Sequence, residues 1–539
     1  MTSNLKKTLK VAYFCMEFGL HEDFRIYSGG LGILAGDILK AAKDLETQMV
    51  GVGILWRQGY VEQTIGKDGK TVDSYPAYSY DFLKDTGVKV TVNIREREVV
   101  CKVWECTEYG NVPLYLLDTN LPENADALLT GQLYGWFQEE RVAQEMILSI
   151  GGVRALEKLG IDVDIYHFND SHPVLAGTEL IKKLMKEEGI SFKEAWKKVR
   201  QKIIFTTHTP VVAGNEVHSH RVLEYMGAYN GLTYEQMKEL GGDPFSMTVA
   251  GLRLSRKANG VAKLHGETAK KMWDYVEGSS EIIAITNGVH NKTWQDDRII
   301  KAFEEGSDLW EPHMKLKREL FEEIYKRNGV KLDENVLTIG FARRAAPYKR
   351  SDLIFRNKEV IEKLLSGNRL QIVFAGKAHP NDLVGKEIIA NLYEMSKKYA
   401  GSIVFLQNYD MKIGKIITRG CDIWLNNPIR PMEASGTSGM KAAMNGVLNC
   451  SVLDGWWPEG CEHGVTGWQI GDGYEGPDAD RVDSESLYKV LLNEIIPTYY
   501  NDRQKWKEMM RNSIEMSHWN FSAERMVSDY YEKMYEEVE

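Results

Sequence analysis

The hydrophobic positions along the chain fall into two successive blocks, in each of which short apolar runs alternate with helical patterns. In the first block, the apolar runs at 163–170, 202–210 and 281–289 each end in polar residues, and helical patterns cover 139–159 and 173–187. Continuous apolar runs of this length are typical of strands that are buried on both faces. The block therefore predicts a parallel sheet covered by helices.

Two further apolar runs, at 10–18 and 49–56, open the same block. Residues 88–119 differ, because apolar and polar positions alternate there and turn signals recur. This alternation indicates β-hairpins inserted into the block.

The second block repeats the arrangement after a charged, helical stretch at 301–334. Its expected strands lie at 335–344, 369–379, 402–410, 421–427 and 446–455. Its expected helices lie near 352–366, 382–400 and 411–420, and the tail 485–539 is also helical in pattern. The fold class that we predict is α/β, with two doubly wound Rossmann-like domains that face each other across a cleft.

The chain has 539 residues, which is too long for one compact core. We expect an N-terminal Rossmann-like domain with inserted hairpins at 1–300 and a second Rossmann-like domain at 301–510. A C-terminal helix at 511–539 is expected to pack back on the N-terminal domain. In such folds ligands bind beyond the carboxyl ends of the strands, so the cleft is the expected site.

Composition narrows the class of protein. A net charge of −10 argues against broad nucleic-acid binding, which needs a basic face. The six cysteines are scattered without a CxxC pair, so neither a disulfide framework nor a zinc site is expected. The first residues lack a signal-peptide pattern, and no apolar run is long enough to span a bilayer. We expect a cytoplasmic protein with no nucleic-acid partner, no membrane partner and no metal.

The glycine-rich stretch YSGGLGILAGD at 27–37 precedes an expected helix. Backbone N–H groups at such a helix start can hold an anion, and a plain turn is an equally good interpretation. Residues 30–35 also fit the dinucleotide pattern G-x-G-x-x-A. The distance from the preceding strand and the missing acidic residue after the next strand argue against a dinucleotide.

A basic cluster, FARRAAPYKR at 341–350, directly follows an apolar strand. Most charge runs are solvated surface. At the end of a buried strand, however, the arginine forks and the lysine of this cluster suit phosphate better. They are Arg343, Arg344, Lys349 and Arg350.

The stretch EASGTSGMKAAMNG at 433–446 places Lys441 four residues after Thr437. We expect Lys441 near a helix start, where the helix dipole would lower the pKa of its amine. A neutral amine can form a Schiff base with an aldehyde, although most such lysines are surface residues.

Three segments carry a histidine at or near an expected strand end, at 167–173, 206–210 and 286–290. Their spacing lacks the helical pairs of a metal site. Hydrogen bonding to a hydroxyl-rich ligand explains these segments better, through Asn169, Asp170, His208, Asn287 and Glu433. For the HSHR run at 218–221 we expect no functional role.

Taken together and in this order, YSGGLGILA, FNDSHP, HTP, NGVAKLH, RRAAPYKR and EASGTSGMKAAMNG resemble the α-glucan (glycogen, starch, maltodextrin) phosphorylases, in particular a compact prokaryotic subgroup. The resemblance runs from about residue 13 to about residue 457. It implies the two-domain GT-B glycosyltransferase fold and the cofactor pyridoxal 5′-phosphate.

The resemblance also implies residue roles. It assigns the cofactor to Lys441, as the Schiff-base lysine, and to Arg343, Tyr409, Gly436, Thr437 and Ser438. It assigns catalysis to His208, Arg344, Lys349 and Glu433. It assigns substrate binding to Gly30, Leu31, Asp170, His172, Asn259, Tyr348 and Ser435.

The activity implied is phosphorolysis of α-1,4-glucans, with α-glucan and inorganic phosphate as partners and glucose 1-phosphate released with retention. In the family the phosphate of the cofactor lies against the substrate phosphate, and two adjacent anions need fixed cations. A GT-B synthase that uses a nucleotide sugar is the main alternative, and a carbohydrate-binding protein without activity is a third. The resemblance leaves open whether the chain forms homo-oligomers.

Some positions depart from the family pattern. Asp410 stands where an arginine is expected, and we expect Arg430 to supply the missing charge. Trp456 and Trp457 are expected to stack on sugar.

Overall fold

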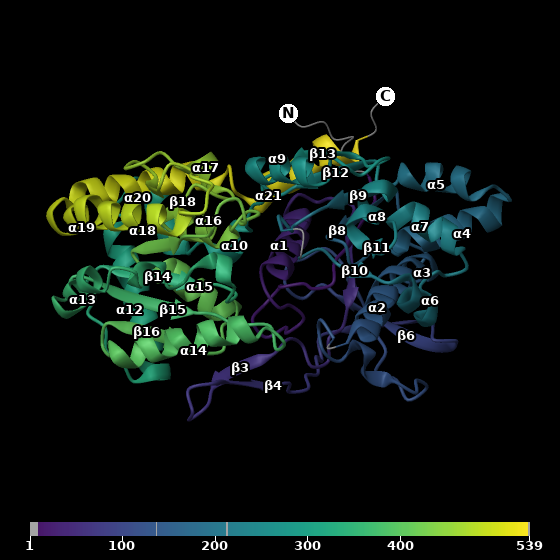
Figure 1. The fold of residues 1–539 in the computed structure, drawn as a ribbon, viewed down its shortest axis with the longest axis horizontal. Helices are drawn as coiled ribbons and strands as arrows, with labels where there is room; N and C mark the ends of the chain where they lie inside the picture. The colour runs from purple at the N-terminus through teal and green to yellow at the C-terminus, as the bar shows by residue number, and fades with distance from the viewer. Residues whose placement is uncertain (1–8, 136, 212–213, 537–539) are drawn as a thin grey trace. The chain divides into compact units, whose positions relative to one another are not determined.

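The computed structural model describes residues 9–135, 137–211 and 214–536, which fold into two compact units (Figure 1). The described residues of the first unit lie within 9–60, 75–286 and 523–536, and those of the second within 61–74 and 287–522. The chain thus passes between units at 60/61, 74/75, 286/287 and 522/523. For the last two boundaries the sequence had suggested 300/301 and 510/511. The mixed α/β fold with parallel sheets, consistent with a GT-B fold, is confirmed.

A nine-stranded sheet forms the core of the first unit. Across the sheet its strands are β13 (Glu281–Ala284), β12 (Lys257–Gly260), β9 (Ile203–Thr206), β8 (Ile165–Asn169), β1 (Val11–Phe14), β2 (Met49–Ile54), β7 (Leu114–Asp118), β6 (Arg97–Cys106) and β5 (Lys84–Ile94). Neighbours from β13 to β7 pair in parallel, whereas β6 and β5 add an antiparallel hairpin at one edge. The hairpin expected within 88–119 is therefore confirmed.

Helices cover this sheet because the crossovers between parallel strands must return along its faces. The principal ones are α1 (Gly30–Asp44), α2 (Gln138–Met146), α3 (Gly152–Lys158), α4 (Ala176–Glu188), α5 (Phe192–Arg200), α8 (Met247–Leu254) and α9 (Lys263–Met272). The last helix of the chain, α21 (Ala523–Tyr530), also belongs to this unit and packs against α1 (Figure 1, yellow against purple).

Six parallel strands form the core of the second unit. Their order is β16 (Ile403–Leu406), β15 (Gln371–Ala375), β14 (Thr338–Ala342), β17 (Ile423–Asn426), β18 (Leu448–Val452) and β19 (Gly467–Ile470). Every residue of β14 to β18 is buried, which explains the unbroken apolar runs in the sequence. The main helices are α12 (Trp310–Asn328), α13 (Lys358–Ser366), α14 (Leu383–Lys398), α15 (Met411–Gly420), α16 (Thr437–Met444), α18 (Ala479–Val490) and α20 (Arg503–His518).

One element of the second unit comes from the N-terminal half of the sequence. The hairpin of β3 (Glu62–Ile65) and β4 (Thr71–Ser74) belongs to this unit. Asp73 forms an ion pair with Lys386 at 2.6 Å, and the N–H of Ile65 donates to Oε1 of Gln407 at 2.8 Å. The sequence did not predict this excursion, because nothing local in 61–74 shows which unit the hairpin packs against. β3 and β4 form a two-stranded sheet of their own.

In each of the two sheets the strand order reverses at one point. Open α/β folds bind ligands at such a point, beyond the carboxyl ends of the strands. In the first unit the chain builds β2 and β7 on one side of β1 and β8, β9, β12 and β13 on the other. In the second unit the reversal lies between β14 and β17. These two reversal points are where the candidate residues gather.

The opposite end of the second sheet holds a buried ionic cluster around Asp422. Its carboxylate accepts hydrogen bonds from Nζ of Lys317 at 2.6 Å, Nε2 of His313 at 2.9 Å and the N–H of Thr338 at 2.8 Å. All four residues are almost completely buried.

Asp422→Asn should destabilise the second unit strongly, because it leaves the buried lysine without a counter-charge. Removing one partner of a buried ion pair costs about 3–5 kcal/mol, or roughly 10 °C in Tm for a unit of this size. Thermal unfolding measures the shift. The matched control, Lys363→Ala, breaks the exposed pair with Glu359 and should change Tm by little. Equal shifts for both variants would contradict this account of the cluster.

The sequence had indicated neither a membrane-spanning segment nor a signal peptide. Within the described residues, no helix is both long enough and apolar enough to cross a bilayer. The expectation of no signal peptide falls mainly on residues 1–8, which lie outside the described residues.

Candidate active site

Arg343 links the two central strands of the second unit. It follows β14, and its guanidinium donates to Oδ1 of Asn426 and, at 2.7 Å, to the carbonyl of Leu425, both in β17. Burial lowers its pKa below the usual arginine value, yet its Nε is buried and has no hydrogen-bond partner among the described residues. A cation with a spare buried donor fits an anionic group.

α16 has an open N-terminus, and both its first turn and Arg343 contact Trp424. Gly436 precedes the helix with φ of 83°, a left-handed conformation that favours glycine, and no side chain caps the first turn. The first N–H groups of a helix have no acceptor within it, so they can bind a phosphate. Oγ of Ser438 accepts from Nε1 of Trp424 at 3.2 Å, which ties the helix start to β17.

Lys441 is the fifth of the eight residues of α16 and lies in its last turn. The expectation that it lies at the helix start is wrong, and the dipole argument for a neutral amine no longer applies. Lys441 is instead buried, with Nζ 3.6 Å from the ring centroid of Trp294. A cation over an indole face is an attractive contact, and here it fixes the direction of the lysine side chain.

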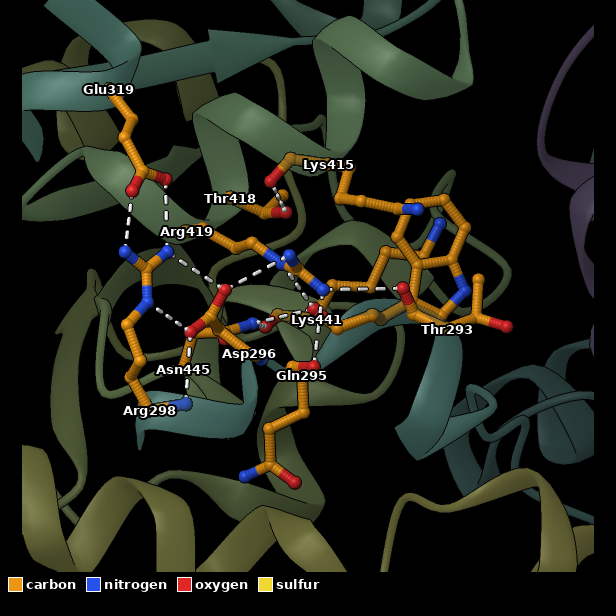
Figure 2. A network of polar contacts seen from close by, with 11 residues as sticks. Thr293, Gln295, Asp296, Arg298, Glu319, Lys415, Thr418, Arg419, Lys441 and Asn445 are labelled. Carbon is orange, nitrogen blue, oxygen red and sulfur yellow. Dashed lines mark hydrogen bonds and ion pairs between the residues drawn. The ribbon is translucent and has the colours of Figure 1, made fainter. Parts of the chain in front are cut away.

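Figure 2 shows the polar network around Lys441 and the neighbouring segment of the second unit. The carbonyl of Trp294 accepts from Nε of Arg419 at 2.9 Å and from Nδ2 of Asn445 at 3.0 Å. The same Nδ2 donates to the carbonyl of Lys441 at 2.8 Å. Arg419 also pairs with Asp296 at 3.2 Å. The indole and the lysine are thus held by one shared set of bonds. Sequence reasoning missed Trp294, because only the folded chain brings it to Lys441.

The basic cluster after β14 separates into different roles. Lys349 forms an ion pair with the carboxylate of Glu433, and both side chains are largely buried. Arg344 is exposed and has no ion pair within the described part of the chain. Arg350 instead pairs with Asp483 at 2.6 Å and with Asp480 at 3.1 Å. Of the three cations beyond Arg343, Lys349 is paired with Glu433, Arg350 is paired with two aspartates, and Arg344 keeps an exposed charge.

Three other predicted residues lie close to these cations. Tyr348 places its ring centroid 4.7 Å from Nζ of Lys349. Burial raises the pKa of Tyr409 to about 12, and the charge of Arg343 opposes that rise. Oγ of Ser435 is buried without a hydrogen-bond partner in the described chain. An unpartnered buried hydroxyl is the kind of group that a bound sugar would satisfy.

The positions that depart from the family pattern have structural explanations. Asp410 is the N-cap of α15, and its Oδ1 accepts from the N–H of Ile413 at 3.0 Å. Arg430, expected to replace a missing charge, pairs with Glu475 at 2.8 Å. Trp456 and Trp457 are almost fully buried, so the prediction that they stack on sugar is wrong.

The glycine-rich turn of the first unit follows β1. Some of its backbone N–H groups donate to a carboxylate, and others have no acceptor within the helix. Buried Glu17 accepts from the N–H of Ser28 at 2.5 Å and of Gly29 at 3.1 Å. Gly30 and Leu31 are the first residues of α1, so their N–H groups have no acceptor within the helix. Only these later N–H groups are available to an anion.

Polar residues after β8 and β9 meet at the reversal point of the first sheet. Oδ1 of Asn169 lies 2.6 Å from Nε2 of His208, and its Nδ2 donates to Sγ of Cys15 at 3.3 Å. This amide orientation makes Nε2 of His208 the donor and leaves Nδ1 as an acceptor. Burial lowers the pKa of His208 to about 3, so its ring is neutral.

Asp170 and His172 lie next to this pair. Asp170 has φ of 68°, a strained conformation for a residue other than glycine, and such strain is common at functional sites. Burial raises the pKa of Asp170 to about 6. Burial also lowers the pKa of His172 to about 4, and its Nδ1 has no partner within the described residues.

Asn259 has a different environment from the one expected for a sugar ligand. It is completely buried; its Oδ1 accepts from Oγ1 of Thr206 at 2.7 Å. Its Nδ2 donates to the hydroxyl of Tyr530 at 3.1 Å and to the carbonyl of Gly260 at 3.0 Å. All of these hydrogen bonds lie inside the first unit, so Asn259 has a structural role instead of the predicted role in sugar binding.

The HSHR run contributes to an ionic cluster that sequence reasoning did not find. Nε2 of buried His218 lies 2.9 Å from Oε2 of Glu145, and Glu216 is close to both. Although burial opposes it, the charge of Glu145 raises the pKa of His218. Arg141 lies 3.7 Å from Glu216. Two carboxylates thus face two cations, and ion pairing explains the cluster.

Buried neutral histidines predict an acid-labile first unit. Burial lowers the pKa to about 3 or 4 at four positions: His167, His172, His208 and His265. Below pH 6.5 the unfolded chain binds protons that the folded chain does not, so each position costs about 1.4 kcal/mol per pH unit. Asp170 acts in the opposite direction, but the histidines outnumber it. Thermal unfolding should show Tm falling between pH 6.5 and 5, and a flat or rising Tm would contradict this.

Comparisons with known proteins find chains that are similar over most of their length. A family model described as carbohydrate phosphorylase matches residues 143–229 and 300–459. The maltodextrin phosphorylase of Thermococcus litoralis is 41% identical over 97% of this chain and 70% of its own length. The glycogen phosphorylase of Aquifex aeolicus is 37% identical over 98% and 86%. An uncharacterised protein of Methanocaldococcus jannaschii is 37% identical over 97% and 99%.

Proposed function

This chain belongs to the carbohydrate phosphorylase family, and from that premise we propose that it cleaves α-1,4-glucans with inorganic phosphate and releases glucose 1-phosphate with retained configuration. The single observation that carries the proposal is the set of donors beside Lys441. Arg343 is half-buried and has a buried Nε without a partner among the described residues, and the N-terminus of α16 is uncapped. The Nε and the first N–H groups of α16 are hydrogen-bond donors that an anionic group bound near Lys441 would satisfy.

These residues fit pyridoxal 5′-phosphate. Lys441 would hold the cofactor covalently, while Arg343 and the N–H groups of Thr437 and Ser438 would bind its phosphate. Gly436 allows a close approach of the backbone, and Tyr409 would lie beside the ring. Bound there, the cofactor would supply a phosphate group that can exchange a proton with the substrate phosphate.

In the second unit, Arg344 and Lys349 would bind the substrate phosphate. In the first unit, the N–H groups of Gly30 and Leu31 would offer donors to an anion. Two phosphates in proximity repel each other strongly in a site of low dielectric constant, so fixed cations are required. Lys349 already pairs with Glu433. It would therefore exchange a carboxylate partner for a phosphate partner when substrate binds.

Each unit by itself offers neutral or anionic hydrogen-bond acceptors that suit a sugar. In the second unit these are Glu433, the hydroxyl of Ser435 and Tyr348. In the first unit they are His208, Asp170 and His172. A neutral His208 can accept a hydrogen bond through Nδ1 across the working pH range, which suits binding of a sugar hydroxyl.

The reaction is tested directly by incubating the purified protein with maltodextrin and inorganic phosphate. Phosphate-dependent release of glucose 1-phosphate is the expected result. Release of free glucose, or activity only with ADP-glucose or UDP-glucose, would contradict the proposal and favour a hydrolase or a nucleotide-sugar synthase. The reverse reaction, chain extension from glucose 1-phosphate, provides a second readout.

A further inference from the structure

Asp454 is a completely buried carboxylate beside the candidate site, and none of the roles above uses it. It follows β18 by two residues, at the carboxyl end of the second sheet. Oδ2 accepts the N–H of Glu433 at 2.8 Å, and Oδ1 accepts the N–H of Gly455 at 2.8 Å. Both carboxylate oxygens therefore accept hydrogen bonds from backbone N–H groups, one of which belongs to Glu433.

Residues 454–456 pack directly against the backbone of residues 433 and 435, on either side of Ala434. Gly455 has φ of 58°, and a Cβ there would lie 2.3 Å from the carbonyl oxygen of Ser435. The N–H of Trp456 donates to that carbonyl at 2.9 Å. Residues 433 and 435 are thus held from one side by residues 454–456, and no side chain larger than hydrogen fits between them.

Electrostatic interactions also link Asp454 to Glu433 and Lys349. The groups that face it are Glu433 and Lys349, and Arg430 donates to the neighbouring carbonyl of Leu453. Lys349 pairs with Glu433 and acts on Asp454 only through its charge. Burial and the charge of Glu433 raise the pKa of Asp454 to about 7, whereas the two N–H donors and Lys349 oppose that rise.

We propose that Asp454 is a positioning residue that fixes the backbone of Glu433, and so keeps its carboxylate in place for the sugar when Lys349 turns to phosphate. This inference rests on the proposed function of Glu433 and Lys349. It follows from geometry, because the only side-chain bond of Glu433 within the described chain is the one that Lys349 would give up. Once that bond opens, the N–H bond to Asp454 remains.

Asp454→Asn tests the inference, because asparagine keeps the shape but can accept only one of the two N–H groups with its oxygen. A misplacement of about 1 Å costs on the order of 100-fold in rate, so kcat/KM for glucan should fall by roughly that factor. The KM for phosphate should stay within about twofold. The acid limb that an ionisable Asp454 gives near neutral pH should be absent from the variant's pH profile.

Asp422→Asn is the matched control, since it replaces an equally buried aspartate at the other end of the same sheet. It should lower Tm while the glucan and phosphate kinetics keep their ratio. A crystal structure of Asp454→Asn should show the backbone of Glu433 displaced, a readout that does not need activity.

Wild-type-like glucan kinetics in Asp454→Asn, or an unmoved Glu433 in its crystal structure, would overturn the inference and leave the proposed function standing. Loss of glucan and phosphate kinetics in equal measure, with a drop in Tm like that of Asp422→Asn, would also overturn it. Absence of glucose 1-phosphate release by the wild-type protein would instead count against the proposed function, and the crystal structure alone would then decide the role of Asp454.

Discussion

Lys441→Ala protein is expected to purify without cofactor and to lose phosphorolytic activity. Lys441 is the buried amine that faces Trp294. It belongs to α16, whose start is uncapped, and the same unit holds the spare donor of Arg343. Loss of an acid–base group alone lowers rates by roughly 10²–10⁴-fold, so activity should fall at least that far.

The matched variant Lys441→Arg separates loss of the tether from loss of the charge. Arginine keeps a cation over the indole of Trp294 but cannot hold the cofactor covalently. It should therefore lose cofactor absorbance and activity as the alanine variant does, while its Tm stays closer to wild type. Full cofactor content in either variant would mean that the tether lies elsewhere in the chain.

Arg344→Ala is expected to raise the KM for phosphate and lower kcat together. The guanidinium is exposed and has no ion pair within the described chain, so its charge is available to an incoming anion. A hydrogen bond to a charged group contributes about 1.5–3 kcal/mol, which corresponds to roughly 10- to 150-fold in kcat/KM for phosphate. Initial rates at varied phosphate and fixed maltodextrin measure both constants.

Two variants control this experiment. Arg344→Lys keeps the charge but loses the bidentate fork, so an intermediate effect is expected. Arg356→Ala removes an arginine of the same unit that pairs with Asp480 at the surface, and it should leave the phosphate kinetics unchanged. Unchanged phosphate constants in Arg344→Ala would remove this arginine from the phosphate site.

The long apolar runs of the sequence were sufficient to predict most of the two sheets. Strands such as β14 and β17 are buried on both faces, and their sequences show it without any tertiary information. β12 was missed, because Lys257–Gly260 contains only one apolar residue, Ala258. Its strand conformation is set by pairing with β9 and β13 on either side, which no local pattern reveals.

The candidate site was predictable where a motif fixes the backbone and unpredictable where tertiary contacts decide. Arg343 and Lys441 belong to motifs that lie at strand and helix ends, and the fold brings both to one reversal point. Asn259 also lies in a motif, but a motif does not say which face of a strand its side chain takes. Trp294 and Asp454 reach the site only through folding, so their sequence context gave no signal.

The central claim is that Lys441 carries pyridoxal 5′-phosphate, and borohydride reduction followed by peptide mapping tests it most directly. Reduction fixes a pyridoxyl group covalently on the lysine that holds it. We predict one pyridoxyl group per chain, on the peptide that contains residue 441, together with loss of the cofactor absorbance. A reduced protein without the modification, or with the modification on a different lysine, would contradict the account.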